Sequence, residues 1–195
     1  MIWKSKHIGE RELCGVRLVN DSFMNLRLAG IEIRLSSFER CLFKECDFSG
    51  VIIQDSGFIE ADFHGSRISN LDLSVGYFKK CKFDEVVAEG TVFRQLRKSD
   101  ERLEWMDMRK TSFVKADLSG AIFMKCRLNG ADFRGAKLER CVFEGCDLSG
   151  ADFSDTQLAG VNFEKSRIDK TVLDLNGFVS IGQAKGFVLS DWQNS

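Results

Sequence analysis

Residues 116–155 read ADLSGAIFMKCRLNGADFRGAKLERCVFEGCDLSGADFSD, and a Leu or Phe recurs in them at every fifth position. On an α-helix a step of five residues turns about 140°, which would scatter these side chains around the whole cylinder. On a straight strand the same step would place them alternately on two faces. Neither regular element buries them together, so the stretch requires a different backbone path.

The same five-residue register extends from Leu13 to Phe178, on residue numbers ending in 3 or 8, and contains 16 of the 17 Phe. The position two residues before each large residue is mostly Ala, Ser, Cys or Gly. The position two residues after it holds 11 of the 17 Gly, and a sharp bend favours a residue without Cβ. Each unit is therefore predicted to be a short extended segment followed by a bend.

Four such units, each ending in a bend of about 90°, close a square coil, and successive coils can stack as parallel strands do. All the large residues then point inward. The chain contains no Pro, which is consistent with a hydrogen-bonded ladder along its whole length. We predict an all-β solenoid of about eight coils, roughly 40 Å long, over residues 11–178.

Composition adds little about partners. The 28 basic and 29 acidic residues give a formal net charge of −1, so no polybasic arm or acidic tail indicates a nucleic-acid or membrane ligand. The N-terminal residues have no apolar run, and no later segment approaches the roughly 20 apolar residues of a membrane span. We expect a single cytoplasmic domain.

The units ADLSG, ADFRG, CDLSG and ADFSD resemble the pentapeptide repeat family, whose consensus is A(D/N)LXX. The resemblance implies a right-handed quadrilateral β-helix without a cofactor, often dimerising through its C-terminal end. The family includes fluoroquinolone-resistance proteins of the Qnr type. It also includes immunity proteins against gyrase poisons such as microcin B17 and albicidin, which resemble a DNA duplex in size and engage DNA gyrase.

The segment LRKSDERLEWMDMRK, residues 96–110, breaks the repeat. Lys98 stands where a large apolar residue belongs and Glu101 where a small one does, and a buried unpaired charge is too costly there. We predict that part of the segment projects as a loop or helical turn, which would rotate later face assignments if five or ten residues left the coil. The candidate partner-binding residues here are Arg102, Glu104, Trp105 and Asp107; a local cap over a coil edge is the alternative.

Imitation of DNA can be tested against charge density. Duplex DNA carries about one charge per 1.7 Å, so a 40 Å rod imitating it fully would need on the order of 20 negative charges. A net charge of −1 restricts any mimicry to one face. Counting in twenties gives the face of Leu13, Ile33, Ile53 and Phe153 a net charge near −4. The candidate binding residues at its C-terminal end are Asp132, Asp152, Asp155 and Asp174.

Both ends of a solenoid need covering, because an open coil exposes apolar side chains and unpaired backbone. Residues 1–10 are predicted to cap the first coil. Residues 179–195 leave the repeat and are predicted to cover the last coil or to form a homodimer. The candidate residues for that contact are Phe187, Val188, Leu189 and Trp192.

Catalytic and metal-binding signals are weak. Six of the seven Cys lie in the small inward column, where a buried thiol serves as a small apolar filler. No CxxC pair, phosphate-binding loop or GxSxG motif is present, and the repeated Asp follow from the period. We predict a non-enzymatic protein that binds a type II topoisomerase as a partial DNA mimic and protects it from an inhibitor. The alternative is a rigid interaction scaffold or regulatory module without such a target.

Overall fold

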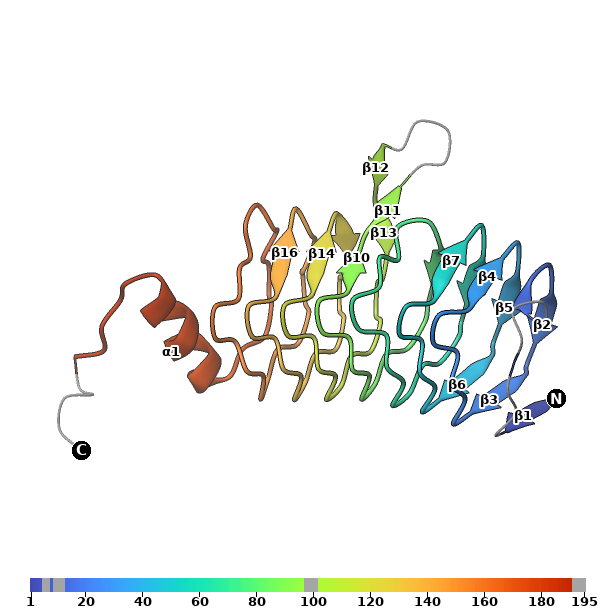
Figure 1. Ribbon diagram of the computed structural model, residues 1–195. Helices are drawn as coiled ribbons and strands as arrows, with labels where there is room; N and C mark the ends of the chain where they lie inside the picture. Colours follow the sequence, from blue (N-terminus) through green and yellow to red (C-terminus); the bar gives the residue numbers. More distant parts are fainter. Residues whose placement is uncertain (5–7, 9–12, 97–101, 191–195) are drawn as a thin grey trace.

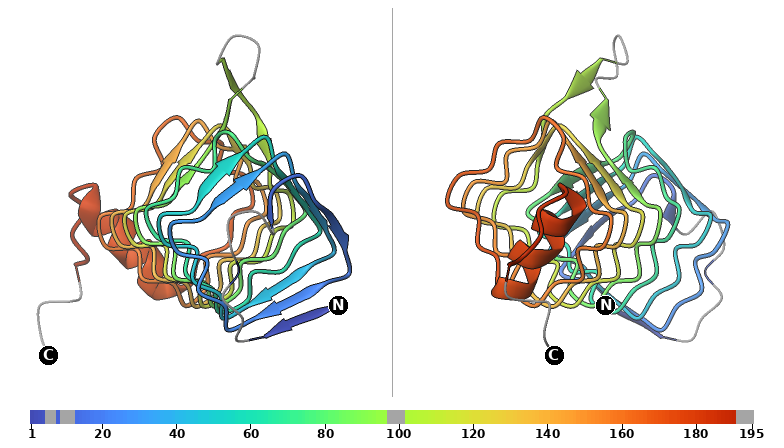
Figure 2. Two further views of the ribbon diagram at one scale, coloured as in Figure 1. Left: turned by 45° about the vertical axis from the view of Figure 1, so that its right-hand side comes forward. Right: turned by 90° about the vertical axis from the view of Figure 1, so that its left-hand side faces the viewer.

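The computed structural model describes residues 1–4, 8, 13–96 and 102–190, which wind as a square rod closed at its C-terminal end by a helix (Figures 1 and 2). Its elements are short. They are β1 (Ile2–Lys4), β2 (Arg17–Val19), β3 (Ser22–Met24), β4 (Glu32–Arg34), β5 (Ser37–Glu39), β6 (Leu42–Lys44), β7 (Ile52–Gln54), β8 (Gly57–Ile59), β9 (Tyr77–Lys79), β10 (Val92–Phe93), β11 (Gln95–Leu96), β12 (Leu103–Glu104), β13 (Met106–Asp107), β14 (Ile122–Met124), β15 (Cys126–Arg127), β16 (Val142–Glu144) and α1 (Leu175–Ala184).

Each coil strand pairs in parallel with a strand of the next coil, usually 20 residues later in the sequence. The sheet β2-β5-β8-β9 is the longest, and isolated bridges such as Asp132↔Asp152 continue the ladders where no strand is long enough to form. The predicted fold, a right-handed quadrilateral β-helix, is confirmed. The coils number slightly fewer than the eight expected, because some residues leave the coil and the last repeats give way to α1.

Four faces enclose the core, and each is named here by its large inward residues. Face A has Phe23, Phe43, Phe63, Phe83, Phe113, Phe133 and Phe153; face B has Leu28, Phe48, Ile68, Ala88, Leu118, Leu138 and Leu158; face C has Leu13, Ile33, Ile53, Leu73, Phe93, Phe123 and Phe143; face D has Phe38, Phe58, Phe78, Met108, Leu128 and Leu148.

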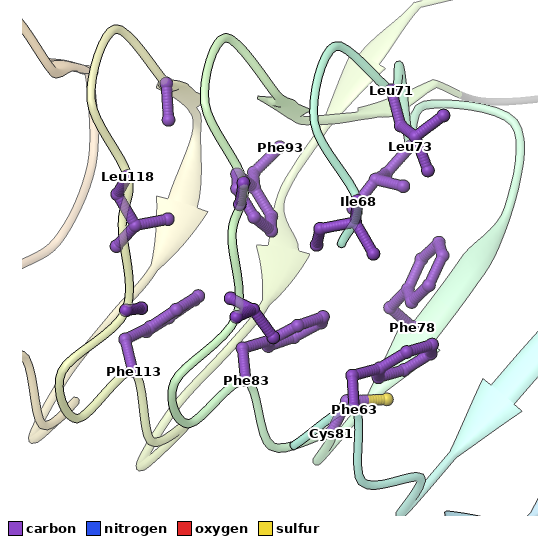
Figure 3. Close-up of a cluster of buried hydrophobic side chains, with 14 of the residues drawn as sticks. Phe63, Ile68, Leu71, Leu73, Phe78, Cys81, Phe83, Phe93, Phe113 and Leu118 are labelled. Carbon is purple, nitrogen blue, oxygen red and sulfur yellow. The ribbon is translucent and has the colours of Figure 1, made fainter. Parts of the chain in front are cut away.

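The Phe rings of one face stack on one another along the rod. On face A, Phe63 lies 5.3 Å from Phe83, and Phe83 lies 5.3 Å from Phe113, with interplanar angles of 10° or less (Figure 3). Burying a Phe side chain stabilises the fold by roughly 1.5–3 kcal/mol. The predicted inward column is therefore the core of the protein.

The bends lie where the Gly spacing predicts them. The 11 Gly in that column all have positive φ, for example 66° at Gly120. Other residues in the same column also adopt it, such as Asn25 at 54° and Lys115 at 56°. Because an L residue with a Cβ pays about 1–2 kcal/mol in this conformation, the coil imposes the bend even where the sequence opposes it.

Several small inward residues do more than fill space. Cys46 Sγ donates to the Phe23 carbonyl at 3.5 Å, and Ser66 Oγ donates to the Phe43 carbonyl at 2.8 Å. Each acceptor is the carbonyl of a large inward residue one coil earlier, at a corner that lacks the turn bond to it. The filler interpretation of the cysteines was thus incomplete, because most of them also donate hydrogen bonds to buried carbonyls.

Burial favours the protonated form of most of these thiols. It raises the pKa of Cys46 to about 11 and that of Cys81 to about 12. Cys146 is the exception, since a hydrogen bond with the Cys126 thiol lowers its pKa. A thiol that remains protonated at neutral pH can donate a hydrogen bond and is a poor nucleophile, so Cys46 and Cys81 are structural.

The interruption removes ten residues from the coil. Before it, partners are 20 residues apart; across it, Val87 pairs with Asp117 and Val92 with Ile122, which are 30 apart. The hairpin of β11 and β12 projects from the rod at this point (Figure 1). Lys98 and Glu101, on which the expectation rested, lie outside the described residues.

This ten-residue step corrects the face assignment. Counting in twenties placed Phe153 on the face of Leu13, whereas it lies on face A, stacked 4.7 Å from Phe133. Ten residues are two of the four sides, so every later unit is rotated by half a turn. The charge near −4 had combined residues from opposite sides of the rod, and that sum is wrong.

The two ends differ from the repeat. β1 extends the ladder of face A, where Trp3 stacks on Phe23 at 5.6 Å. At the other end α1 begins at Leu175, with Asp174 as its N-cap. Phe178, counted as an inward residue, is 63% exposed on this helix. Its place in the five-residue register is coincidental, because the coil has already ended.

Candidate protein-interaction surfaces

The first candidate surface is the acidic C-terminal end of the rod. Asp132 and Asp152 are ladder neighbours on face A, and Asp155 follows at the next bend. Asp174 lies close by, since one of its carboxylate oxygens accepts the Asp155 N–H at 3.0 Å. The four predicted residues therefore lie at the same end of one face, although not on the face to which they were assigned.

Three of these carboxylates make structural contacts. Asp132 accepts two hydrogen bonds from the Arg134 guanidinium, at 2.9 and 2.7 Å, which hold the pKa of its carboxyl below the usual value. Asp152 accepts from the N–H and hydroxyl of Ser154. Asp174 caps α1 by accepting the Gly177 N–H at 2.7 Å. Much of the negative charge on this surface is thus already used by the fold.

The second candidate surface lies at the base of the projecting hairpin. Trp105 is 44% exposed, and the Arg127 guanidinium lies over its ring, 5.5 Å from the centroid. Asp107 accepts two hydrogen bonds from Arg109, at 2.8 and 2.7 Å, which lower the pKa of its carboxyl. Glu104 pairs with Gln95 across β11 and β12, and Arg102 is exposed just before β12.

A groove of about 410 Å³ opens beside this hairpin. Tyr77 and Lys79 of β9 form one wall, and Trp105 and Asp107 lie on the other. The sequence interpretation missed Tyr77, which is the single Tyr of the chain and lies at an outward repeat position with half of its surface exposed. A large aromatic residue at a position otherwise mostly polar was the available signal.

The third candidate surface is the apolar C-terminal end. Phe187, Val188 and Leu189 are 73%, 83% and 46% exposed, and with α1 they border a hollow of about 160 Å³. Figure 2 shows α1 lying across the open end of the coil. Trp192, predicted as part of the same contact, lies outside the described residues. Exposed apolar surface of this kind is typical of an interaction site.

Within the described ranges, no group of three His, Cys, Asp or Glu side chains is arranged to hold a metal ion. His64 Nε2 lies 3.8 Å from a Glu85 carboxylate oxygen on the outside of the rod. The described part of the chain also has no helix with the length and apolar character of a bilayer span. The candidate surfaces for function are therefore the acidic C-terminal end of face A, the base of the projecting hairpin and the apolar C-terminal end.

Sequence comparison identifies the repeat directly. The family model described as pentapeptide repeats matches eight copies over residues 126–164. These residues are pentapeptide repeats, and the match supports the resemblance found in the sequence. No curated protein matches this repeat protein in sequence.

Solved structures similar to this repeat protein include full-length QnrB1, described as a plasmid-mediated fluoroquinolone resistance protein. The match has 20% identity and a TM-score of 0.60, and covers 95% of this chain and 97% of QnrB1. A trypsin-treated QnrB1 variant matches at 17% identity and a TM-score of 0.44, covering 97% of each chain. HetL from Nostoc sp. strain PCC 7120, involved in heterocyst differentiation regulation, matches at 17% and 0.32, covering 85% of this chain and 92% of HetL. At 20% identity the likeness to full-length QnrB1 shows the fold alone.

Proposed function

We propose that this repeat protein acts by binding another protein, a type II topoisomerase such as DNA gyrase or topoisomerase IV, and protects it from an inhibitor. The observation that carries the proposal is the match to QnrB1, a fluoroquinolone resistance protein, over 95% of the chain at a TM-score of 0.60. The proposed role is non-enzymatic, needs no cofactor and places the protein in the cytoplasm with its target.

Partial imitation of DNA is the proposed mode of contact. The acidic end on face A supplies Asp152 and Asp155, whose carboxylates have no basic side chain among their hydrogen-bonding partners in the described residues. A short acidic strip imitates a few phosphates rather than a full duplex, because DNA of the same length carries on the order of 20 charges. The hairpin residues Trp105 and Arg102 then provide contacts that DNA does not make.

A homodimer through the C-terminal end forms part of the proposal. Leu175 and Phe178 on α1 are 78% and 63% exposed, and they adjoin the exposed Phe187 and Val188. Burying such side chains in a second copy gains about 25 cal/mol per Å² of apolar surface. Two rods joined end to end would present one long surface to a two-fold symmetric enzyme.

A rigid interaction scaffold without a topoisomerase target is the second candidate. It is favoured by the structural use of Asp132 and Asp174, which leaves less free negative charge than a DNA mimic needs.

A supercoiling assay separates the two candidates. Purified protein is added to DNA gyrase and relaxed plasmid with and without a fluoroquinolone, and the drug-induced cleavage complexes are counted. We expect restored supercoiling and fewer cleavage complexes, with a weaker effect for Trp105→Ala and Asp155→Asn. Ile52→Ala, an exposed apolar change on face C, is the matched control. No change in either readout would remove the topoisomerase target and favour the scaffold.

A further inference from the structure

Two of the buried cysteines lie at the same corner of consecutive coils. Cys126 and Cys146 each stand two residues before a large inward residue of face D. The Asp147 N–H donates to the Cys126 carbonyl at 3.0 Å, and Arg127 pairs with Asp147, so the two backbones are in register. Both side chains lie inside the rod, with exposed fractions of 0% and 2%. The two thiols are therefore neighbours along the ladder.

The two side chains also point the same way. Cys126 Sγ donates to the Phe93 carbonyl at 3.2 Å, and Cys146 Sγ donates to the Phe123 carbonyl, the equivalent acceptor one coil later, at 3.3 Å. Neighbouring strands lie about 4.8 Å apart, which is within the Cα–Cα range of about 4.4–6.8 Å found in disulfides. Both cysteines are free thiols in this structure. A disulfide between them requires rotation of the side chains and little movement of the backbone.

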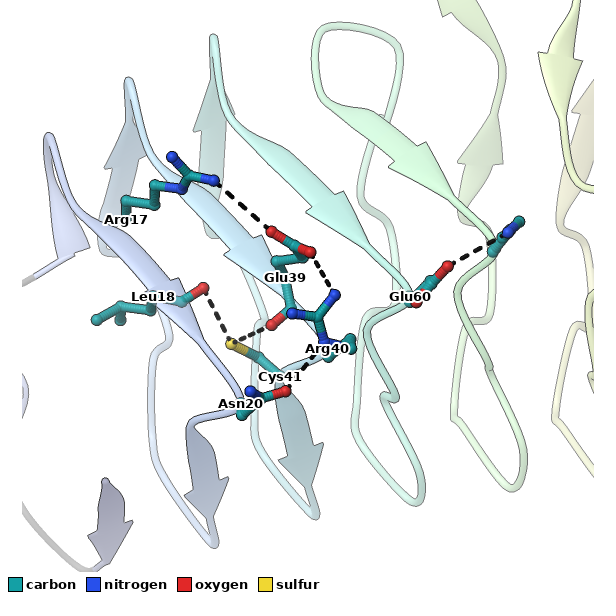
Figure 4. Close-up of polar contacts among 8 residues, drawn as sticks. Arg17, Leu18, Asn20, Glu39, Arg40, Cys41 and Glu60 are labelled. Atoms are coloured by element: carbon teal, nitrogen blue, oxygen red, sulfur yellow. Dashed lines mark hydrogen bonds and ion pairs between the residues drawn. The ribbon is translucent and has the colours of Figure 1, made fainter.

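The other inward cysteines have no cysteine at the same corner of an adjacent coil. The residues one coil before and after are Asp21 and Ala61 for Cys41, Leu26 and Ser66 for Cys46, Ala61 and Thr111 for Cys81, and Ala121 and Val161 for Cys141. Figure 4 shows the Cys41 thiol between the carbonyls of Leu18 and Glu39, 3.6 Å from each. Among the described residues, Cys126 and Cys146 are thus the pair that the coil places for a disulfide.

The surroundings of the two thiols differ. Hydrogen bonds with the Cys126 thiol and with the Ser166 hydroxyl lower the pKa of Cys146. Burial raises the pKa of Cys126 well above its usual value. The thiolate is the form that attacks an oxidant. Cys146 is therefore the thiol that reacts first, and Cys126 is the one that reacts with its product.

Cys146 is also the nearer of the two to the end of the rod. Ser166 takes the next place at this corner, where its Oγ accepts the Cys146 N–H at 3.0 Å. Ile168, the inward residue that follows Ser166, is 58% exposed. A terminal coil has a neighbour on one side only, so it opens more readily than the coils behind it. Opening of the last coil exposes Cys146 to a small solute before it exposes Cys126.

We propose that Cys126 and Cys146 are a site of reversible oxidation by hydroperoxides, which joins the two coils by a disulfide. The Cys146 thiolate attacks one oxygen of hydrogen peroxide, the O–O bond breaks, and Cys146 becomes a sulfenic acid as hydroxide leaves. The Cys126 thiol then attacks the Cys146 sulfur, the S–S bond forms, and the sulfenic oxygen leaves as water. Two thiols and one hydrogen peroxide thus give one disulfide and two water molecules.

The disulfide fastens one coil of the rod to the next, close to the acidic end of face A and to α1. In a reducing compartment a disulfide of this kind is transient and reports on oxidants, because cellular thiols reduce it again. The inference concerns the fold's own thiols and does not rest on a topoisomerase target.

Peptide mapping tests the link. Reduced protein is treated with millimolar hydrogen peroxide, quenched with catalase, alkylated under denaturing conditions and digested with trypsin. We expect a Cys126–Cys146 cross-link that dithiothreitol removes, with Cys41, Cys46 and Cys81 alkylated. Cys141 and Cys146 lie in one tryptic peptide, so Cys141→Ser is measured in parallel. A Cys141–Cys146 link, or oxidation to sulfonic acids without a cross-link, would overturn the proposal.

Trapping of the sulfenic acid tests the order of reaction. Dimedone should label Cys146 in Cys126→Ser, whereas Cys126 in Cys146→Ser should be labelled at least about tenfold more slowly. Both variants should fold, because Ser36 and Ser56 already donate to the equivalent carbonyls at this corner of earlier coils. Equal labelling of the two cysteines, or faster labelling of Cys126, would overturn the inference.

Thermal unfolding tests whether the link fastens the coils. Oxidised protein should have a midpoint at least about 4 °C above that of reduced protein, because a disulfide restrains the unfolded chain. Cys126→Ser should abolish this difference, and Cys41→Ser, at a corner without a second thiol, should retain it. A peroxide-treated protein with the midpoint of the reduced one, or a difference that survives in Cys126→Ser, would contradict the proposal.

Discussion

The first half of the coil, residues 13–94, and the second half, residues 106–173, share one architecture and fill their cores differently. In the first half, Phe rings on adjacent faces, A with B or D, meet at 46° to 73°. From Phe83 onward, neighbouring Phe rings lie on the opposite faces A and C and meet at 84° to 90°. The second half thus places its Phe side chains on two facing sides of the coil, with Leu or Met on the other two.

The corners of the two halves also differ. In the second half most bends are tight turns closed by a small residue, as where the Ala116 N–H donates to the Phe113 carbonyl at 3.1 Å. In the first half many corners are extended and lack that turn bond, and Ser or Cys from the next coil donates to the carbonyl instead. Units close to the Ala–Asp–Leu consensus therefore specify a tight-turn corner, whereas departures from it are tolerated through side-chain hydrogen bonds.

The largest expected effect tests whether the two core arrangements are packed equally tightly. Phe133→Ala in the second half and Phe58→Ala in the first both empty a fully buried site in a stack with neighbours 4.7 to 5.0 Å away. Each should cost about 3–5 kcal/mol of unfolding free energy, with Phe58→Ala at the lower end because the Phe43 and Phe63 rings on the adjacent face can lean into the cavity.

Urea denaturation followed by circular dichroism measures both variants. Phe163→Ala, at a partly buried position near the open end, is the control and should cost less. A larger loss of unfolding free energy for Phe58→Ala than for Phe133→Ala would show that the first half of the coil is packed at least as tightly as the second half.

A smaller effect separates the two kinds of corner. Cys46→Ala removes a side-chain donor to the Phe23 carbonyl, whereas Cys141 donates no thiol hydrogen bond to a carbonyl among the described residues and its nearest equivalent acceptor, Leu118 O, already accepts Ala121 N–H at 2.9 Å. Cys46→Ala should therefore cost about 1 kcal/mol more than Cys141→Ala, because it also removes a buried hydrogen bond.

Thermal unfolding of the two variants gives that difference, and Cys46→Ser should recover most of the loss by restoring a donor. Identical costs for Cys46→Ala and Cys141→Ala, without rescue by Ser, would mean that the thiols act as fillers in both kinds of corner.

The smallest expected effect is a loss of stability at acid pH that the two halves of the coil should share. Hydrogen bonds from Ser49 and Ser149 lower the pKa of Asp47 and Asp147, one in each half. A carboxyl with a lowered folded pKa stabilises the protein above its unfolded pKa of about 3.9 and loses that contribution as the pH falls through the folded value. Asp47→Asn and Asp147→Asn should each reduce the difference in thermal midpoint between pH 7 and pH 3.

Asp47→Asn and Asp147→Asn are then compared with each other. We expect equal reductions in the thermal-midpoint difference, because Asp47 and Asp147 accept the N–H of the residue two positions later at 2.9 and 3.1 Å. A reduction confined to the second half would show that the surrounding coil, rather than this local bond, controls the carboxyl.

Particular residues show how far sequence reasoning reaches. The inward column at Phe123 and Phe133 and the bends at Gly120 and Gly130 follow from spacing and chirality, and the structure has them where predicted. The candidate residues Asp132 and Trp105 were identified, but their contacts with Arg134 and Arg127 were not. Tyr77 was missed because its place in the groove depends on Trp105 and Asp107, which the chain brings opposite it only after the excursion of the hairpin.

The five-residue period by itself determined the square coil, its core and its corners, because each unit carries its own inward residue and its own bend. Tertiary structure decided how many residues leave the coil and which face each later unit occupies. It also decided that β9 and β13 belong to separate sheets. Those outcomes depend on which strands meet after a long excursion of the chain. Local side-chain pattern does not encode such a pairing, since a removal of five residues or of ten leaves every unit equally well formed.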